Sequence, residues 1–126
     1  MNALLRRMLI IISLLLLISC AAIGIYSAQD HFDYGLSYFN RGEYDAAIPF
    51  FEKATELDPN FADAYLFLGR SYLNLGQWSK AVPPLRAALR LAPEKMKHEI
   101  TSLLTDALMG AGLQKMETLD NKEDPH

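Results

Sequence analysis

Apolar, small and polar residues recur along this chain in the same order after 34 residues. A fixed period of this length is typical of stacked repeats, in which each unit buries its apolar face against the next. The pattern therefore favours a binding scaffold over a catalytic site. The matching positions are Gly35 and Gly69, Tyr38 and Tyr72, Gly42 and Gly76, Tyr44 and Trp78, Ala47 and Ala81, Phe51 and Leu85, Ala54 and Ala88, Leu57 and Leu91, and Pro59 and Pro93.

Each repeated position has a physical role in a pair of packed helices. Small residues such as Ala54 and Ala88 let neighbouring helices approach closely, and large residues fill the space between them. Gly42 and Gly76 fit the turn inside each unit, because a residue without a Cβ tolerates left-handed backbone angles. Proline then separates one unit from the next.

Two polar pairs are candidate helix starts. Ser27 with Asp30 predicts a cap at the beginning of the first unit. Asn60 with Asp63 predicts the same arrangement at the beginning of the second unit.

At the repeated positions the chain resembles the tetratricopeptide repeat family, whose 34-residue unit consists of two antiparallel helices. Two positions depart from the family pattern, because Tyr34 replaces the usual leucine before Gly35 and His31 replaces a large residue. The second unit fits the pattern directly with Tyr65 and Leu68-Gly69. The resemblance implies an all-α helix-turn-helix solenoid, with one repeat at residues 28–61 and another at residues 62–95.

The segment at residues 96–112 keeps helical spacing, with one apolar and one polar face. No second helix of the repeat type follows it, so we expect a capping helix or degenerate third repeat that covers the last full repeat. Residues 113–126 are polar and acidic, which predicts a frayed tail. The predicted fold is therefore two full repeats and a capping helix, preceded by an apolar leader or transmembrane helix.

Residues 1–27 have the features of a membrane-targeting segment. Arg6 and Arg7 precede an uncharged stretch whose most apolar part, Met8 to Ile18, has the length of a signal-peptide core. The stretch continues into Leu17-Ile18-Ser19-Cys20, which resembles the lipobox of bacterial lipoproteins, and Cys20 is the only cysteine. The resemblance implies cleavage before Cys20 and a diacylglyceryl group on its thiol.

Two alternatives to lipidation stay open. Apolar residues continue to Tyr26, and the stretch from Met8 to Tyr26 approaches the roughly 20 residues that a helix needs to span a bilayer. The segment is then an uncleaved anchor, or else the leader of a soluble exported protein. For a lipoprotein or an anchor, Arg6 and Arg7 on the cytoplasmic flank predict that the repeats lie in the bacterial cell envelope, outside the cytoplasm.

Charge and composition exclude several classes of function. The formal net charge is −3, and it becomes −5 without the two leader arginines, so nucleic acid is not an expected partner. A lone cysteine excludes an internal disulfide framework. The sequence has no phosphate-binding glycine loop and no metal-ligand spacing around its histidines. We expect no enzyme activity, no cofactor and no metal.

The resemblance places the candidate site in the concave groove that the first helix of each unit lines. Apolar residues occupy places where a clamp for a terminal carboxylate would need polar ones. A partner helix or an extended apolar peptide is therefore the expected ligand. Alternatively, the apolar members pack on the capping helix or on a second copy. The predicted contact residues are Phe32, Leu36, Phe39, Asn40, Leu66, Arg70, Leu73 and Asn74.

Two functions are consistent with these features. The first is a membrane-tethered protein–protein interaction module that faces the extracytoplasmic side and binds a protein segment in its groove. The second is a self-associating structural component of an envelope assembly, since an exposed apolar groove favours a homodimer.

Overall fold

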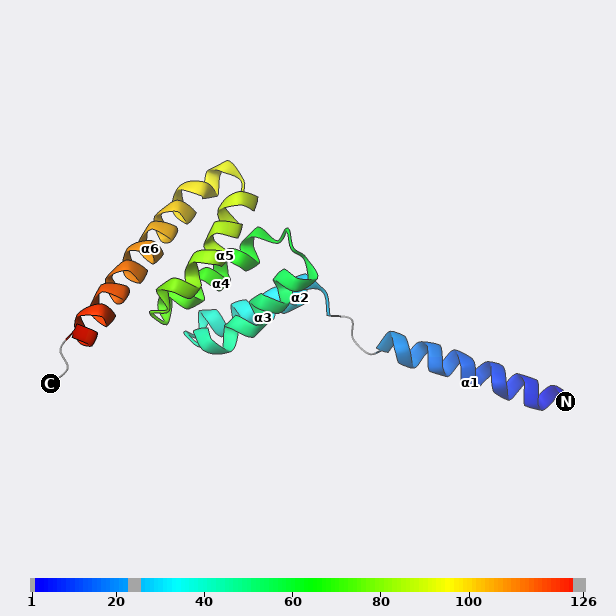
Figure 1. Ribbon diagram of the computed structural model, residues 1–126. Helices are drawn as coiled ribbons and strands as arrows, with labels where there is room; N and C mark the ends of the chain where they lie inside the picture. Colours follow the sequence, from blue (N-terminus) through cyan, green and yellow to red (C-terminus); the bar gives the residue numbers. More distant parts are fainter. Residues whose placement is uncertain (1, 23–25, 124–126) are drawn as a thin grey trace.

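The computed structural model describes residues 2–22 and 26–123, with side chains described for residues 2–14 and 26–122. All regular structure in these residues is helical (Figure 1). The helices are α1 (Ala3–Ala22), α2 (Ala28–Asn40), α3 (Tyr44–Leu57), α4 (Ala62–Asn74), α5 (Trp78–Leu91) and α6 (Glu94–Glu123).

Helices α2 to α6 pack in chain order, each mainly against the next (Figure 1). The first helices of successive units also contact one another, α2 with α4 and α4 with α6, whereas α3 and α5 do not meet in the described residues. A stack with this pattern of contacts is curved, and its first helices lie on the concave side. The predicted all-α helix-turn-helix solenoid is confirmed.

The interior consists of two apolar clusters, one for each junction between units. Phe51 and Ala54 are fully buried in the first cluster, and Leu85 and Ala88 are fully buried in the second. These residues match one another across the 34-residue period, so the repeat in the sequence is a repeat of the core.

Two glycines allow the close approach that the small repeated residues predict. A Cβ at Gly35 would lie 2.6 Å from the ring of Phe51, and one at Gly69 would lie 2.6 Å from the side chain of Leu85. Both distances are shorter than real contacts allow, so any larger residue would push the helices apart. Gly42 and Gly76 have φ of 77° and 68°, which confirms their left-handed turn conformation.

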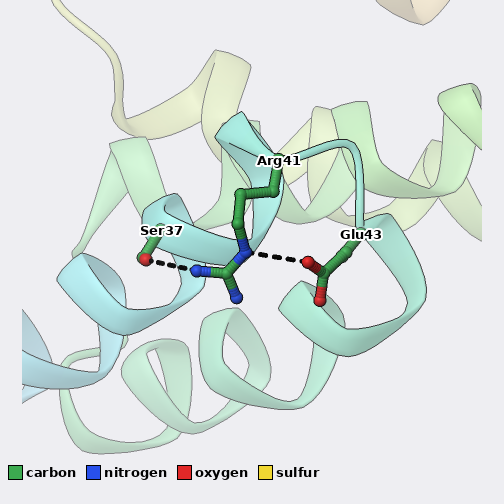
Figure 2. Close-up of polar contacts among 3 residues, drawn as sticks. All are labelled: Ser37, Arg41 and Glu43. Atoms are coloured by element: carbon green, nitrogen blue, oxygen red, sulfur yellow. Dashed lines mark hydrogen bonds and ion pairs between the residues drawn. The ribbon is translucent and has the colours of Figure 1, made fainter.

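Arg41 links the end of α2 to the start of α3 (Figure 2). Its Nε donates to the Glu43 carboxylate at 2.8 Å, and a terminal nitrogen donates to the Ser37 hydroxyl at 3.1 Å. The hydrogen bond to Glu43 raises the pKa of Arg41. The second unit has Leu75 at the corresponding position, so this polar link belongs to the first unit alone.

The two predicted helix starts have different outcomes. Ser27 caps α2 in a capping box, in which its hydroxyl accepts from the Asp30 amide and the Asp30 carboxylate accepts from the Ser27 amide at 2.7 Å. The hydrogen bonds that the Asp30 carboxylate accepts from the Ser27 hydroxyl and from the Ser27 amide lower the pKa of Asp30. The prediction for Asn60 is wrong, because α4 has Phe61 at its N-cap position. The Asn60 amide instead donates to the side chain of Asp58 within the turn.

The last helix is longer than the sequence predicts. We expected a capping helix at residues 96–112 and a frayed tail at residues 113–126, but α6 continues without interruption to Glu123. The residues from Leu113 onward favour helix because they include strong helix formers. The last three residues of the predicted tail, 124–126, lie outside the described part of the chain.

The apolar leader forms α1, which makes no contact with the other five helices among the described residues (Figure 1). Its side chains from Leu4 to Leu14 are exposed. Over the described residues, no helix combines the length and the apolar character that crossing a membrane requires. The side chain of Cys20, on which the lipobox prediction depends, is outside the described part.

Candidate protein-binding groove

Two of the predicted contact residues belong to the core rather than to an open groove. Phe32 is 7% exposed and Leu66 is 3% exposed. Ile100, which follows Leu66 by one more period, is fully buried in α6. Phe32, Leu66 and Ile100 occupy the same place in successive units. The side chain at this place therefore points into the junction between units, where a partner cannot reach it.

The surroundings of these residues explain their burial. Leu66 belongs to the same apolar cluster as Ile100 and Ala107 of α6, so it packs on the capping helix, as the alternative interpretation expected. Phe32 packs among aromatic rings of its own and the next unit, with ring centroids 4.8 Å from Phe61 and 5.7 Å from Phe67.

Three other predicted residues meet at an open cavity of about 290 Å³ on the concave side. Arg70, Leu73 and Asn74 lie on one turn of α4 and form one wall of this cavity. The rest of the lining comes from the start of α5 and from the middle of α6. The lining residues are Arg70, Leu73, Asn74, Trp78, Leu103 and Asp106.

Arg70 is the only cation in the lining of this cavity, and aromatic rings hold its position. Its guanidinium lies 5.4 Å from the ring centre of Phe67 and 5.9 Å from that of Phe39. One terminal nitrogen is 3.5 Å from the Glu99 carboxylate of α6. This ion pair is long and the side chains are 37% and 55% exposed, so a competing carboxylate from a partner can displace Glu99 at little cost.

The remaining predicted residues come from α2 and do not line this cavity. Leu36 and Phe39 are half-buried against the first apolar cluster, and Asn40 is exposed at the end of α2. Phe39 nevertheless connects the two parts of the surface, because its ring packs on Phe67 at 5.1 Å and lies near Arg70. The concave side thus has a cavity at the second junction, and the half-buried Leu36 and Phe39 lie beside it at the first junction.

Sequence reasoning missed the three residues that complete the cavity, Trp78, Leu103 and Asp106. In the sequence, the repeat period pairs Trp78 with Tyr44 and assigns it no groove position. Leu103 and Asp106 lie in the segment interpreted as a cap, so no groove position was assigned there. The 34-residue period could have identified Leu103 and Asp106. It continues into α6 and makes that helix the first helix of a third unit, so α6 also carries groove positions.

The described part of the chain does not bring metal-binding groups together, as it holds no cluster of three or more His, Cys, Asp or Glu side chains that could bind a metal ion. Outside the cavity, Tyr72 of α4 is another ionisable side chain with a shifted pKa. Burial raises the pKa of Tyr72, and its hydroxyl also donates to the Glu52 carboxylate at 3.1 Å. This hydrogen bond joins α4 to α3 and is a structural contact between the two units.

Known families and structures agree with this architecture. The tetratricopeptide repeat family profile matches residues 32–95, and the chain belongs to this family. Domains of this kind generally serve as scaffolds for protein–protein interaction and are typically non-catalytic. Among solved structures, the chain is similar to a tetratricopeptide repeat domain protein from Salinibacter ruber, at 23% identity and a TM-score of 0.53, over 71% of this chain and 91% of that one. No curated protein matches the sequence.

The burial of Leu66 predicts that its truncation destabilises the fold. We expect Leu66→Ala to lower the free energy of unfolding by about 2–5 kcal/mol, because it removes atoms from a packed junction and leaves a cavity. Leu57→Ala is the matched control, since Leu57 is 47% exposed at the end of α3. Urea unfolding followed by circular dichroism measures both, and equal losses for the two variants would contradict the assignment of Leu66 to the core.

Proposed function

We propose that this protein is a membrane-tethered interaction module that binds a segment of a partner protein on its concave side. The observation that carries the proposal is the cavity at the second junction, where Leu73, Trp78 and Leu103 offer apolar surface beside the guanidinium of Arg70. An apolar side chain can enter a cavity of this size, and ligand segments commonly dock in such grooves through a few anchors.

The polar groups of the cavity define the chemistry of the partner segment. Arg70 offers a positive charge on one wall, and Asp106 offers a negative charge from α6. The Asn74 side-chain amide donates to the Arg70 carbonyl at 2.8 Å, which leaves its carbonyl oxygen to accept from a ligand. A segment with an apolar anchor and an acidic neighbour next to Arg70 fits these groups best.

Tethering through the N-terminus is the second part of the proposal. An apolar stretch from Met8 onward, preceded by two arginines, supports a helix or lipid anchor in the cell envelope. The exposed apolar side chains of α1 and its lack of contact with the described helices are consistent with an environment other than water. On this proposal the repeats lie outside the cytoplasm.

The form of the anchor has its own test. We propose that Cys20 carries a diacylglyceryl group and becomes the N-terminal residue of the mature protein. Mass spectrometry of the membrane fraction should then find a lipidated N-terminal peptide that starts at Cys20. An intact Met1 with an unmodified Cys20 would overturn lipidation and favour an uncleaved anchor helix.

The groove is tested by reversing the charge of Arg70. We expect Arg70→Glu to weaken binding of the partner at least about tenfold, since anchors in a buried contact often contribute about 2 kcal/mol. Arg86→Glu is the matched control, because Arg86 is exposed on α5 and away from the cavity. Affinity is measured by co-purification at graded protein concentration, with circular dichroism of each variant. Equal weakening by both substitutions would contradict the proposed site.

A further inference from the structure

The outward face of the last part of α6 carries an apolar stripe that no described residue covers. The exposed fractions of its side chains run from 46% for Leu108 to 66% for Leu113. We define this outer stripe by Leu108, Met109, Leu113, Met116 and Leu119. Soluble proteins rarely leave a continuous apolar surface of this length open, so the stripe is a candidate interaction surface.

The stripe is separate from the groove and from the core. At 100° per residue, Met109, Leu113 and Met116 lie on the side of α6 opposite Ile100 and Ala107, which are fully buried against α5, and Leu108 and Leu119 lie at one edge of that side. The stripe begins only in the second half of the helix. In the first half the same side is polar, and Thr101 and Thr105 bond to backbone carbonyls one turn back.

The spacing of the stripe is that of a two-helix seam. Met109, Gly112, Met116 and Leu119 follow one another at intervals of three, four and three residues, which is the spacing of the seam in a coiled coil. Gly112 has no atom within 4 Å of its Cβ position, so a partner helix can approach the backbone there.

Charges on the two edges of the seam decide what kind of helix fits it. In the heptad that this seam defines, Lys115 lies on one edge and Asp120 on the other, five residues further on. In a parallel pair of identical helices, opposite edges face each other, and Lys115 of each copy meets Asp120 of the other. An antiparallel pair would place lysine edge against lysine edge.

We propose that the outer stripe binds the same stripe of a second copy of this chain, with the two α6 helices parallel. The five apolar side chains expose on the order of 500 Å² in each copy, so pairing buries at most about 1,000 Å² in total, about the minimum area expected of a biological interface. The contact is isologous, as expected for a two-fold dimer. This dimer contact is separate from the proposed function, because it uses the outer stripe and leaves the concave cavity of both copies free to bind a partner.

Disulfide cross-linking of the full-length protein in detergent micelles tests this pairing. Met116→Cys and Leu119→Cys each introduce a thiol on the seam, and the unsubstituted chain, in which Cys20 is the only cysteine, measures any background cross-linking. Identical positions face each other in a parallel pair, so mild oxidation should give covalent dimers in at least tenfold excess over Asn121→Cys. Asn121 is the matched control, because it is exposed on the other side of the same helix. Yields no higher than the control would overturn the interface.

Orientation and charge pairing have separate readouts. Mixing Met109→Cys with Leu119→Cys should give mostly cross-links between identical chains, whereas a predominance of mixed cross-links would indicate an antiparallel pair and overturn the proposal. Light scattering should show that Lys115→Asp weakens dimerisation at least about tenfold and that adding Asp120→Lys restores it. A double variant as weak as the single one would refute the charge pairing.

Discussion

The Ala88→Trp variant should lose its folded structure or melt at a much lower temperature than the original chain. Ala88 is fully buried in the second apolar cluster, at a place where α5 touches its neighbours through a methyl group. An indole ring has no space there, and overpacking of this kind costs about 1–3 kcal/mol or more. A domain of this size has little stability in reserve, so we expect the melting temperature to fall by more than about 10 °C.

A substitution on the surface of the same helix provides the control for this result. Arg86→Trp introduces the same ring at an exposed position of α5 and should change the melting temperature by only a few degrees. Thermal unfolding followed by circular dichroism compares the two. An unchanged melting temperature for Ala88→Trp would contradict the packing of the repeats through small residues.

On the proposed tethering, replacing Ile11 and Leu14 of α1 with aspartate should keep the protein from reaching the membrane, whether α1 is a cleaved leader or an uncleaved anchor. Both side chains are more than half exposed, so the change should leave the repeats folded. Each aspartate near the centre of a membrane helix costs about 2.5–3.5 kcal/mol on insertion scales, and two of them exceed what a marginal anchor can tolerate. Fractionation after a carbonate wash should find the variant in the soluble fraction.

The control for this prediction keeps the added charge but places it outside the apolar stretch. Asn2→Asp lies before α1 and should leave the protein in the membrane fraction. If the Ile11→Asp, Leu14→Asp variant is also found there, α1 neither directs the protein to the membrane nor holds it there, which would contradict the proposed tethering.

Most of the fold could be predicted from the sequence because its packing depends on residue size at a fixed period. Where two helices touch, the packing leaves room only for a methyl group at Ala54 and Ala88, and for no side chain at Gly35 and Gly69. The same small residues recur at the same positions of each repeat, so the sequence shows where the helices touch. The helix starts were less predictable. Asn60 is a good capping residue by type, but in the turn its backbone amide donates to the Asp58 side chain, and Phe61 occupies the N-cap position of α4. The residue types near the helix start therefore do not predict which residue is the N-cap.

The candidate site was only partly predictable, for a different reason. The position of a residue in the repeat gives its side of the helix but not how much of that side the next unit covers. Leu66 and Arg70 are neighbouring groove positions, yet α6 buries Leu66 and leaves Arg70 at the cavity. The length of α6 was not predicted either, because the residues that follow Leu113 are mostly polar and their composition resembles that of a solvated tail.

Photo-crosslinking from the concave side tests the central claim most directly. A photoreactive amino acid at Asn74, which lines the cavity, should cross-link the protein in intact cells to one discrete partner protein. The same amino acid at Arg86, exposed on α5, should not, and adding Arg70→Glu should abolish the adduct at Asn74. Adducts that form from Arg86 alone, or that persist at Asn74 despite Arg70→Glu, would contradict binding in the groove.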